Sequence, residues 1–141
     1  MSRIFWDTML FVYLLEDNKQ FAPQVRKVLA RSYERGDTLT TSYLALGEVM
    51  AGESPGDDTA RTARAVIEEM GFAFLNFDGR CVDTFSRMRS KVGLKAPDAI
   101  HIACAAAAGS DLFLTNDTKL LSRRLHVQGI QFIVDLMSPI L

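Results

Sequence analysis

The sequence predicts a single α/β domain with a mostly parallel sheet over residues 1–141. Short apolar runs that suit buried strands alternate with longer helical segments, which is the pattern of parallel strands joined by crossover helices. Hydrophobic residues make up 48% of the chain, which is enough for a real core and excludes a disordered protein. The chain has no repeat, low-complexity tract or linker, so we expect one domain.

The N-terminal half predicts three strands and four helices. Strands are expected where short apolar or β-prone runs end at polar residues, and helices where apolar residues recur at helical spacing. Ser42 or Thr41 can cap the third helix, and Asp58 or Thr59 can cap the fourth. The expected elements are a strand at 4–6, helices at 8–15 and 20–35, a strand at 38–41, a helix at 43–51, a polar turn at 52–58, a helix at 59–70 and a strand at 72–77.

The C-terminal half is organised around residues 95–108, K-A-P-D-A-I-H-I-A-C-A-A-A-A. Pro97 can occupy the first helical position, where its missing N–H costs nothing. The residues after Asp98 leave no polar face, which is typical of a buried helix. Around it we expect a helix at 80–92, a break at 109–111, a strand at 112–114, a helix through 120–121 and a strand at 131–134.

Four acidic residues stand in apolar company or at expected strand ends: Asp7, Glu48, Asp98 and Asp117. Sites in parallel sheets form beyond the carboxyl ends of strands, which selects Asp7 after the first strand and Asp117 after the fourth. Glu48 shares a helix face with apolar residues. Asp98 lies in the first turn of the buried helix and needs a partner, because an unpaired buried charge costs on the order of several kcal/mol.

Each acid also has a simpler interpretation. Asp7 and Asp117 could be helix N-caps, Glu48 could lie on the surface, and Asp98 could complement a helix dipole. If the four converge, two carboxylates about 4 Å apart repel by about 4 kcal/mol at an effective dielectric constant of about 20. Some must then stay protonated, or a divalent cation must neutralise them. An all-oxygen set suits Mg²⁺ or Mn²⁺ and not Zn²⁺, and such a site can activate water against a phosphate.

Composition limits the other function classes. The net charge of −1 does not indicate a nucleic-acid binder, yet setting the four acids aside leaves a mildly basic remainder. The N-terminus resembles a signal peptide, but Asp7 interrupts its apolar run and no cleavage site follows. No stretch approaches the roughly 18 apolar residues of a membrane span. Cys81 and Cys104 do not form a disulfide framework, so we expect a cytoplasmic protein with no membrane association.

The ordered set of motifs resembles the PIN-domain nucleases, and most closely the VapC-type toxins of bacterial toxin–antitoxin pairs. The matching pieces are I-F-W-D-T, T-T-S-Y-L-A-L-G-E-V, P-D-A-I-H-I-A-C-A and L-F-L-T-N-D, whose order and spacing agree over nearly the whole chain. The resemblance implies a three-layer α/β/α sandwich with a mostly parallel central sheet, formed by a single PIN domain over residues 1–141.

The resemblance also implies an activity: cleavage of single-stranded RNA by metal-activated water, as the toxin of a VapBC-type pair. Asp7, Glu48, Asp98 and Asp117 match the family's acidic quartet, and Asp7 and Asp98 would be the main ligands of Mg²⁺, or of Mn²⁺ in its place. Thr115 matches a hydroxyl that supports the site. The resemblance further implies a homodimer and a cognate antitoxin that blocks the cleft.

Two positions differ from the family's usual pattern. Met9 stands where the family usually has asparagine, and Lys119 stands where it usually has another acid. These differences keep open the alternative of a catalytically degenerate PIN-like module that binds RNA or protein. A phosphoryl-transfer receiver domain fits less well, because it would have adjacent acids near the first strand, where Asp7 stands alone.

Basic side chains near the acids are the expected RNA contacts, although they could equally be solvated helix faces. They are Arg80, Arg87, Arg89, Lys91, Lys95, Arg123 and Arg124. We interpret His101 as a mostly structural residue whose ring is held by a neighbour in its own helix.

Overall fold

Five strands form the central sheet of the structure, a computed structural model that describes residues 1–52 and 57–141. Neighbouring strands are all parallel, in the order β3-β2-β1-β4-β5, which confirms the predicted parallel sheet. The strands are β1 (Arg3–Trp6), β2 (Thr38–Ser42), β3 (Ala73–Leu75), β4 (Ser110–Leu114) and β5 (Ile130–Val134).

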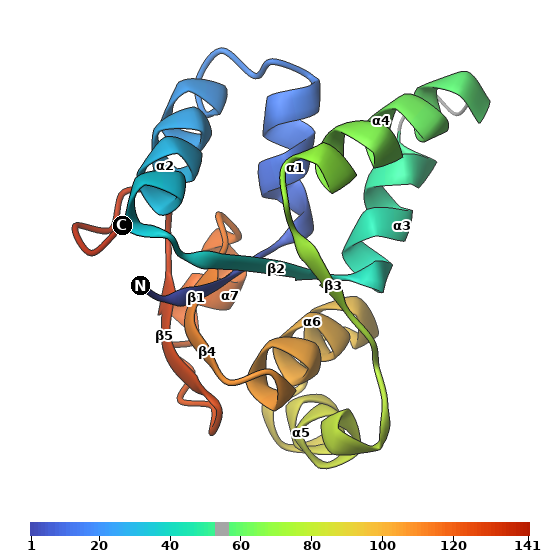
Figure 1. The fold of residues 1–141 in the computed structure, drawn as a ribbon. Coiled ribbons are helices and arrows are strands. Elements are labelled where there is room, and N and C mark those ends of the chain that lie inside the picture. Colours follow the sequence, from blue (N-terminus) through green and yellow to red (C-terminus); the bar gives the residue numbers. More distant parts are fainter. Residues whose placement is uncertain (53–56) are drawn as a thin grey trace.

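Alternating side chains on the strands point to two separate cores. Ile4 and Trp6 of β1 belong to one core, and Phe5 between them belongs to the other. Leu112 and Leu114 of β4 likewise share the first core. Helices cover both faces of the sheet, above and below it in Figure 1. The fold is therefore the three-layer α/β/α sandwich that the sequence predicts.

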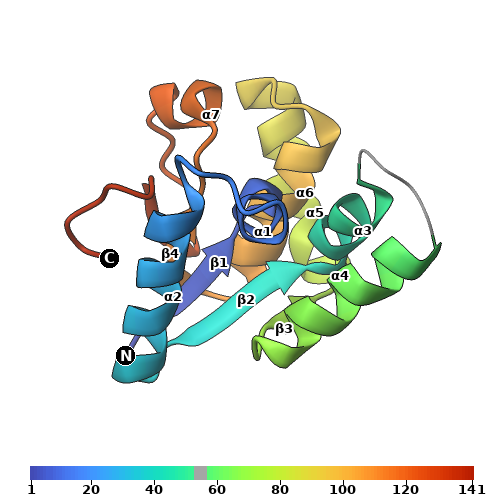
Figure 2. The same cartoon turned by 90° about the horizontal axis from the view of Figure 1, so that it is seen from above.

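One face of the sheet is covered by α1 (Thr8–Leu15), α2 (Ala22–Arg35), α3 (Tyr43–Ala51) and α4 (Asp57–Glu69). Figure 2 shows α2, α1, α3 and α4 lying over this face. Val28 of α2 and Ile67 of α4 reach the core around Trp6. The Trp6 ring lies 5.3 Å from that of Phe11 and 4.9 Å from that of Phe72. This aromatic cluster fixes the end of β1, where the first predicted acid follows.

The other face is covered by η1 (Gly79–Cys81), α5 (Val82–Arg87), η2 (Met88–Val92), α6 (Ala96–Ala107) and α7 (Thr118–Ser122). Helix α6 is the buried helix predicted from its apolar sequence, with Ile102 and Ala103 fully enclosed. It packs between the sheet and the segment formed by η1, α5 and η2, so its first turn has a fixed place beside the carboxyl ends of the strands.

Both cysteines lie in this second layer as buried free thiols. Cys81 and Cys104 each lie 3.7 Å from the carbonyl oxygen of Asn76. Burial raises the pKa of Cys104 to about 12, so this thiol stays protonated. Over residues 1–52 and 57–141, none of the helices has the length and apolarity needed to cross a bilayer.

Three predicted boundaries after residue 71 are wrong. The helix expected over 80–92 is instead a 3-10 turn, an α-helix and a π-helical turn. It ends where Gly93 adopts a φ of 78° and the Leu94 N–H donates to the carbonyl of Met88. Strand β3 has three residues because it is an edge strand that pairs only with the end of β2. Strand β4 begins at Ser110, inside the expected break.

Helix α4 begins before its predicted caps. Asp58 and Thr59 lie inside the helix, whose first described residue is Asp57. The polar turn predicted at 52–58 falls mainly on residues 53–56, which lie outside the described residues. Of the two alternatives for the cap of helix α3, Ser42 is correct, because its side chain accepts a backbone N–H in the first turn.

The strand order creates a crevice beside β1. From β1 the chain passes outward to β2 and β3, and then continues in β4 and β5 on the other side of β1. The direction of winding therefore changes between β1 and β4. Ligands of open parallel sheets bind at such a point, outside the carboxyl ends of the strands. Asp7 follows β1 and Thr115 follows β4 at this place.

Gly129→Ala should destabilise the fold more than Gly36→Ala. Both glycines have positive φ, 97° and 70°, which costs an alanine about 1–2 kcal/mol. A Cβ on Gly129 would also overlap the backbone carbonyl of Ala106 in α6, whereas no described atom lies within 4 Å of a Cβ on Gly36. We expect a further loss of about 1–3 kcal/mol at Gly129, measured by urea unfolding. Equal losses in the two variants would contradict this packing of the β5 turn on α6.

Candidate active site

Asp7 is held rigidly at the end of β1. The backbone N–H of Thr8 donates to its Oδ1 at 2.8 Å, and the hydroxyl of Thr115 donates to its Oδ2 at 2.7 Å. The residue is 9% exposed. The N-cap interpretation is therefore correct, because Asp7 caps α1, and the same carboxylate also faces the crevice through its bond to the β4 side.

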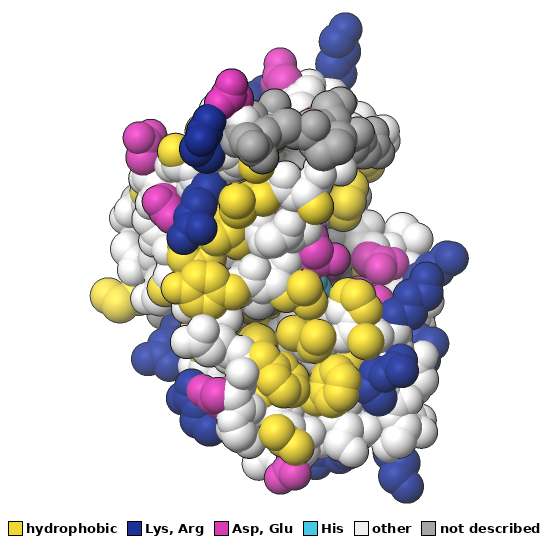
Figure 3. Space-filling view, turned by 90° about the vertical axis from the view of Figure 1, so that its right-hand side faces the viewer, with side chains coloured by type: hydrophobic (Ala, Val, Ile, Leu, Met, Phe, Trp, Pro, Cys, Tyr) yellow, Lys and Arg dark blue, Asp and Glu magenta, His cyan; other side chains and the backbone are white. Residues whose placement is uncertain are grey.

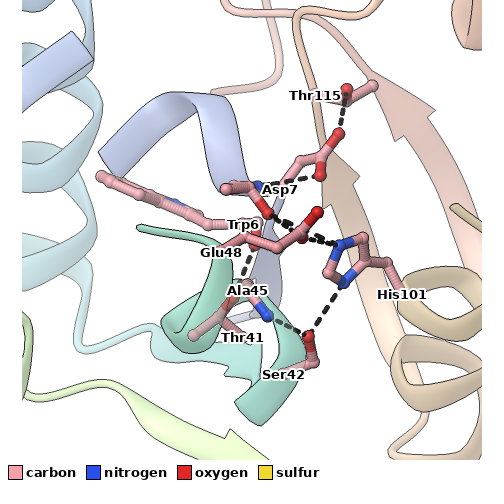
Figure 4. Close-up of polar contacts among 9 residues, drawn as sticks. Trp6, Asp7, Thr41, Ser42, Ala45, Glu48, His101 and Thr115 are labelled. Atoms are coloured by element: carbon pink, nitrogen blue, oxygen red, sulfur yellow. Dashed lines mark hydrogen bonds and ion pairs between the residues drawn. The ribbon is translucent and has the colours of Figure 1, made fainter. Parts of the chain in front are cut away.

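Glu48 lies on α3 and is fixed by two donors. Its Oε1 accepts from the Thr8 hydroxyl and from the Nε2 side of the His101 ring, each at 2.8 Å (Figure 4). The hydrogen bond from His101 holds the pKa of Glu48 below its usual range, partial burial works against this shift, and the bond from Thr8 adds to it. Its side chain is 36% exposed, so the surface interpretation holds for only part of the group.

His101 is 2% exposed and both of its ring nitrogens are engaged. Nδ1 lies 2.8 Å from the Ser42 hydroxyl, and Nε2 faces Glu48 (Figure 4). The expectation that a neighbour within α6 holds the ring is wrong, because its partners come from the end of β2 and from α3. The ring thus ties α6 to α3 across the crevice.

Asp98 lies in the first turn of α6, as predicted. Burial raises the pKa of its carboxyl above the ordinary value. The negative charges of the three other acids raise it further, in the order Asp7, Asp117 and Glu48. Within the described residues, no group donates a hydrogen bond to this carboxylate, so the partner expected for a buried Asp98 is not found among them.

Asp117 caps α7, which confirms its simpler interpretation. Its Oδ1 accepts the N–H groups of Lys119 and Leu120 at 2.9 and 3.2 Å. Its own N–H donates to the hydroxyl oxygen of Thr115 at 3.1 Å. Thr115 is fully buried, and one hydroxyl therefore connects the backbone of Asp117 with the carboxylate of Asp7.

The four predicted acids come from four different elements and are close enough for the charges of Asp7, Asp117 and Glu48 to act on Asp98. Figure 3 shows acidic side chains at the border of a hollow, with histidine atoms inside it and lysine and arginine side chains on one side. Over the described ranges, no three His, Cys, Asp or Glu side chains lie together closely enough to hold a metal ion. The donor chemistry fits Mg²⁺, which is usually held by one or two carboxylates and several waters.

Two of the basic candidates brace the segment before α6. An Nη1–H of Arg89 donates to the carbonyl of Leu94, and one of Arg123 donates to the carbonyl of Val92. Arg80 forms an ion pair with Asp78 at 3.0 Å. These three guanidinium groups therefore have local partners, unlike Lys91 and Lys95, which lie exposed and form no ion pair among the described residues.

The side chains of Met9 and Lys119 make no hydrogen bond to the four acids among the described residues, although the backbone N–H of Lys119 donates to Asp117. Met9 is 44% exposed at the start of α1, and Lys119 is exposed on α7. The sequence interpretation named Ser42 only as a helix cap and did not single out Thr8, whereas their hydroxyls bond to His101 and Glu48, respectively. Their signal was available, because each is a small polar residue at the point where a buried strand passes into an apolar helix.

Comparisons with known proteins identify the family. The family model of the PIN domain matches residues 4–124, so the chain belongs to the PIN-domain family. A search of curated protein sequences finds no match.

Solved structures with a similar fold come from VapBC toxin–antitoxin systems. A chain of VapBC2 from Rickettsia felis, bound to a promoter DNA fragment, is 15% identical with a TM-score of 0.74, covering 94% of this chain and 98% of that one. A chain of VapBC-1 from nontypeable Haemophilus influenzae is 16% identical with a TM-score of 0.69, and the match covers 96% of this chain and 99% of that one. VapC20 from Mycobacterium tuberculosis, a sarcin-ricin loop cleaving toxin, is 15% identical with a TM-score of 0.63, and the match covers 89% of this chain and 98% of that one. At these identities the likeness shows the shared fold.

Asp98→Asn and Glu48→Gln should shift the stability of the metal-free protein in opposite directions. Folding raises the pKa of Asp98, so its ionised form is disfavoured in the folded state at neutral pH, and Asp98→Asn should raise the thermal midpoint in EDTA. Folding lowers the pKa of Glu48, so its ionised form stabilises the fold, and Glu48→Gln should lower the midpoint. Glu34→Gln, an exposed change on α2, serves as the control with no shift.

The two stability changes should also differ in their dependence on pH. The gain from Asp98→Asn should vanish below the ordinary aspartate pKa of about 3.9 and develop as pH rises through the higher folded-state pKa. The loss from Glu48→Gln should persist above the ordinary glutamate pKa of about 4.3 and fade as pH falls through the lower folded-state value. A lower midpoint for Asp98→Asn at neutral pH would show that the four charges do not repel one another.

Proposed function

We propose that the protein is a metal-dependent endoribonuclease that cuts single-stranded RNA, and that it is the toxin of a VapBC-type pair. The observation that supports this most directly is the convergence of Asp7, Glu48, Asp98 and Asp117 at the carboxyl ends of β1 and β4. Phosphodiester hydrolysis needs a water nucleophile and a means of offsetting charge on the phosphate. An acidic hollow that binds a divalent cation provides both.

Mg²⁺ is the cation we propose, with Mn²⁺ able to replace it. Asp7 and Asp98 would hold it: Asp7 is already oriented by Thr8 and Thr115, and Asp98 accepts no hydrogen bond from the described residues. The bound cation would activate water and stabilise negative charge on the scissile phosphate. Glu48, kept ionised by its bond to His101, would accept a hydrogen bond from the attacking water.

Exposed basic side chains support an RNA substrate. Arg87, Lys91, Lys95 and Arg124 are exposed and form no ion pair among the described residues, so they can meet phosphates. VapC20, which has the same fold, is described as cleaving the sarcin-ricin loop, which is consistent with this substrate class. An enzyme that meets cellular transcripts in this way would work in the cytoplasm.

The proposed partners are a cognate antitoxin and a second copy of the chain. The similar solved structures are toxin–antitoxin complexes, which favours an antitoxin. Exposed hydrophobic side chains on α3, on α5 and after β3 favour a homodimer, because a second copy would cover them. They are Tyr43, Val82 and Phe77.

Cleavage of a mixed single-stranded RNA pool should require Mg²⁺ or Mn²⁺ and should stop in EDTA. Asp7→Asn and Asp98→Asn should lower the cleavage rate by at least about 100-fold, more than the loss of a residue that only supports a metal ligand. Glu34→Gln is the matched control with full activity expected. Expression of the wild type should also arrest bacterial growth, and Asp98→Asn should not.

Failure has two distinct forms in this experiment. Cleavage that survives in Asp98→Asn, purified free of metal, would contradict the proposed site. No cleavage together with no Mn²⁺ binding would favour the alternative of a degenerate PIN-like binding module, which Met9 and Lys119 leave open.

Thr115→Val should lower the cleavage rate by about 10- to 100-fold, whereas Thr115→Ser should keep most of it. Valine preserves the shape of the buried side chain but removes the hydroxyl that donates to Asp7 and accepts from the Asp117 backbone. Serine keeps that hydroxyl. Single-turnover rates at saturating Mg²⁺ measure the effect, and equal rates in the two variants would show that this hydroxyl does not orient Asp7.

A further inference from the structure

The His101 ring binds one oxygen of Glu48 and leaves the other without a donor. Nε2 of His101 and the hydroxyl of Thr8 both bond to Oε1, each at 2.8 Å. Over the described residues, Oε2 accepts no hydrogen bond. Glu48 therefore has one oxygen committed to the protein and one oxygen available to a ligand.

The network around the ring determines where its proton must be. A carboxylate can only accept, so the bond between Nε2 and Glu48 requires a proton on Nε2. In the neutral ring, Nδ1 then accepts from the Ser42 hydroxyl, whose oxygen at the same time accepts the N–H of Ala45 as the cap of α3. The cap and the ring thus share one hydroxyl, and α3 and α6 are aligned by the same group (Figure 4).

We propose that His101 is a positioning residue that, with Thr8, holds Oε1 of Glu48 and so presents Oε2 alone to the water and cation of the acidic site. This inference rests on the proposed nuclease function. Glu48 is 36% exposed and would otherwise turn toward solvent. The clamp keeps it beside Asp98, whose pKa responds to its charge.

A purely structural histidine would not be expected at this position. The neighbouring buried residues of α6 are apolar, Ile102 and Ala103 among them, and an apolar side chain would fill the same space without a polar group to satisfy. Both nitrogens of the imidazole instead form hydrogen bonds to side chains at the crevice. His101→Leu should therefore fold well and still lose activity.

Steady-state kinetics with RNA and Mg²⁺ test the clamp. We expect His101→Leu to lower kcat by about 10- to 100-fold with KM changed less than about twofold, and His101→Gln, which keeps an N–H donor, to recover most of the loss. In the Glu48→Gln background, His101→Leu should cost less than about twofold more, because its effect passes through Glu48. Ile102→Val, a buried change on α6 away from Glu48, should retain kcat.

Nitrogen-15 NMR of the metal-free protein gives a readout that does not depend on activity. The chain has two histidines, so the ring spectrum is assigned with His126→Asn. We expect a slowly exchanging proton on Nε2 of His101 whose resonance shifts in Glu48→Gln. An Nε2 without a proton would overturn the clamp.

The outcomes separate this inference from the proposed function. Equal losses from His101→Leu with and without Glu48, or a loss confined to KM, would overturn the positioning role while cleavage by the wild type stands. A wild type that cuts no RNA with any metal would overturn the proposed function and with it the catalytic purpose of the clamp, and the NMR result would still decide its geometry.

Discussion

Repulsion among four carboxylates is the constraint on which the rest of this structure depends. Three of the acids are restrained by donors: Asp7 by Thr8 and Thr115, Glu48 by Thr8 and His101, and Asp117 by the first turn of α7. Asp98 receives no such bond in the described part of the chain, and burial together with the charges of the other three acids raises its pKa. Asp98 is thus the acid whose negative charge has no hydrogen-bond donor, and a bound cation would stabilise its ionised form most.

The fold provides the geometry for this arrangement. The winding direction changes between β1 and β4, so the residues that follow both strands meet in one crevice. Two of the acids in the crevice are also helix caps, because Asp7 caps α1 and Asp117 caps α7. A cap has a defined orientation, since its oxygen is tied to backbone N–H groups. Catalytic and structural interpretations of these acids are therefore compatible.

The sequence predicts the sheet, the buried α6 and the convergence of the acids, because strand alternation, an all-apolar helix and strand ends are local signals. It does not predict the π-helical turn before α6, which depends on Gly93 and on the carbonyls held by Arg89 and Arg123. Nor does it predict the partners of His101, since Ser42 and Glu48 are 59 and 53 residues away along the chain. Periodicity carries no information about contacts of that range.

The most direct measurement is calorimetric titration of Mn²⁺ into the metal-free wild type and Asp98→Asn at several pH values. We expect that the wild type binds Mn²⁺, that its affinity falls as pH is lowered toward the raised pKa of Asp98, and that binding releases protons to the buffer in that range. Asp98→Asn should bind far more weakly and without that proton release. Equal affinity in the two proteins at every pH would contradict the claim that the four acids form one cation site.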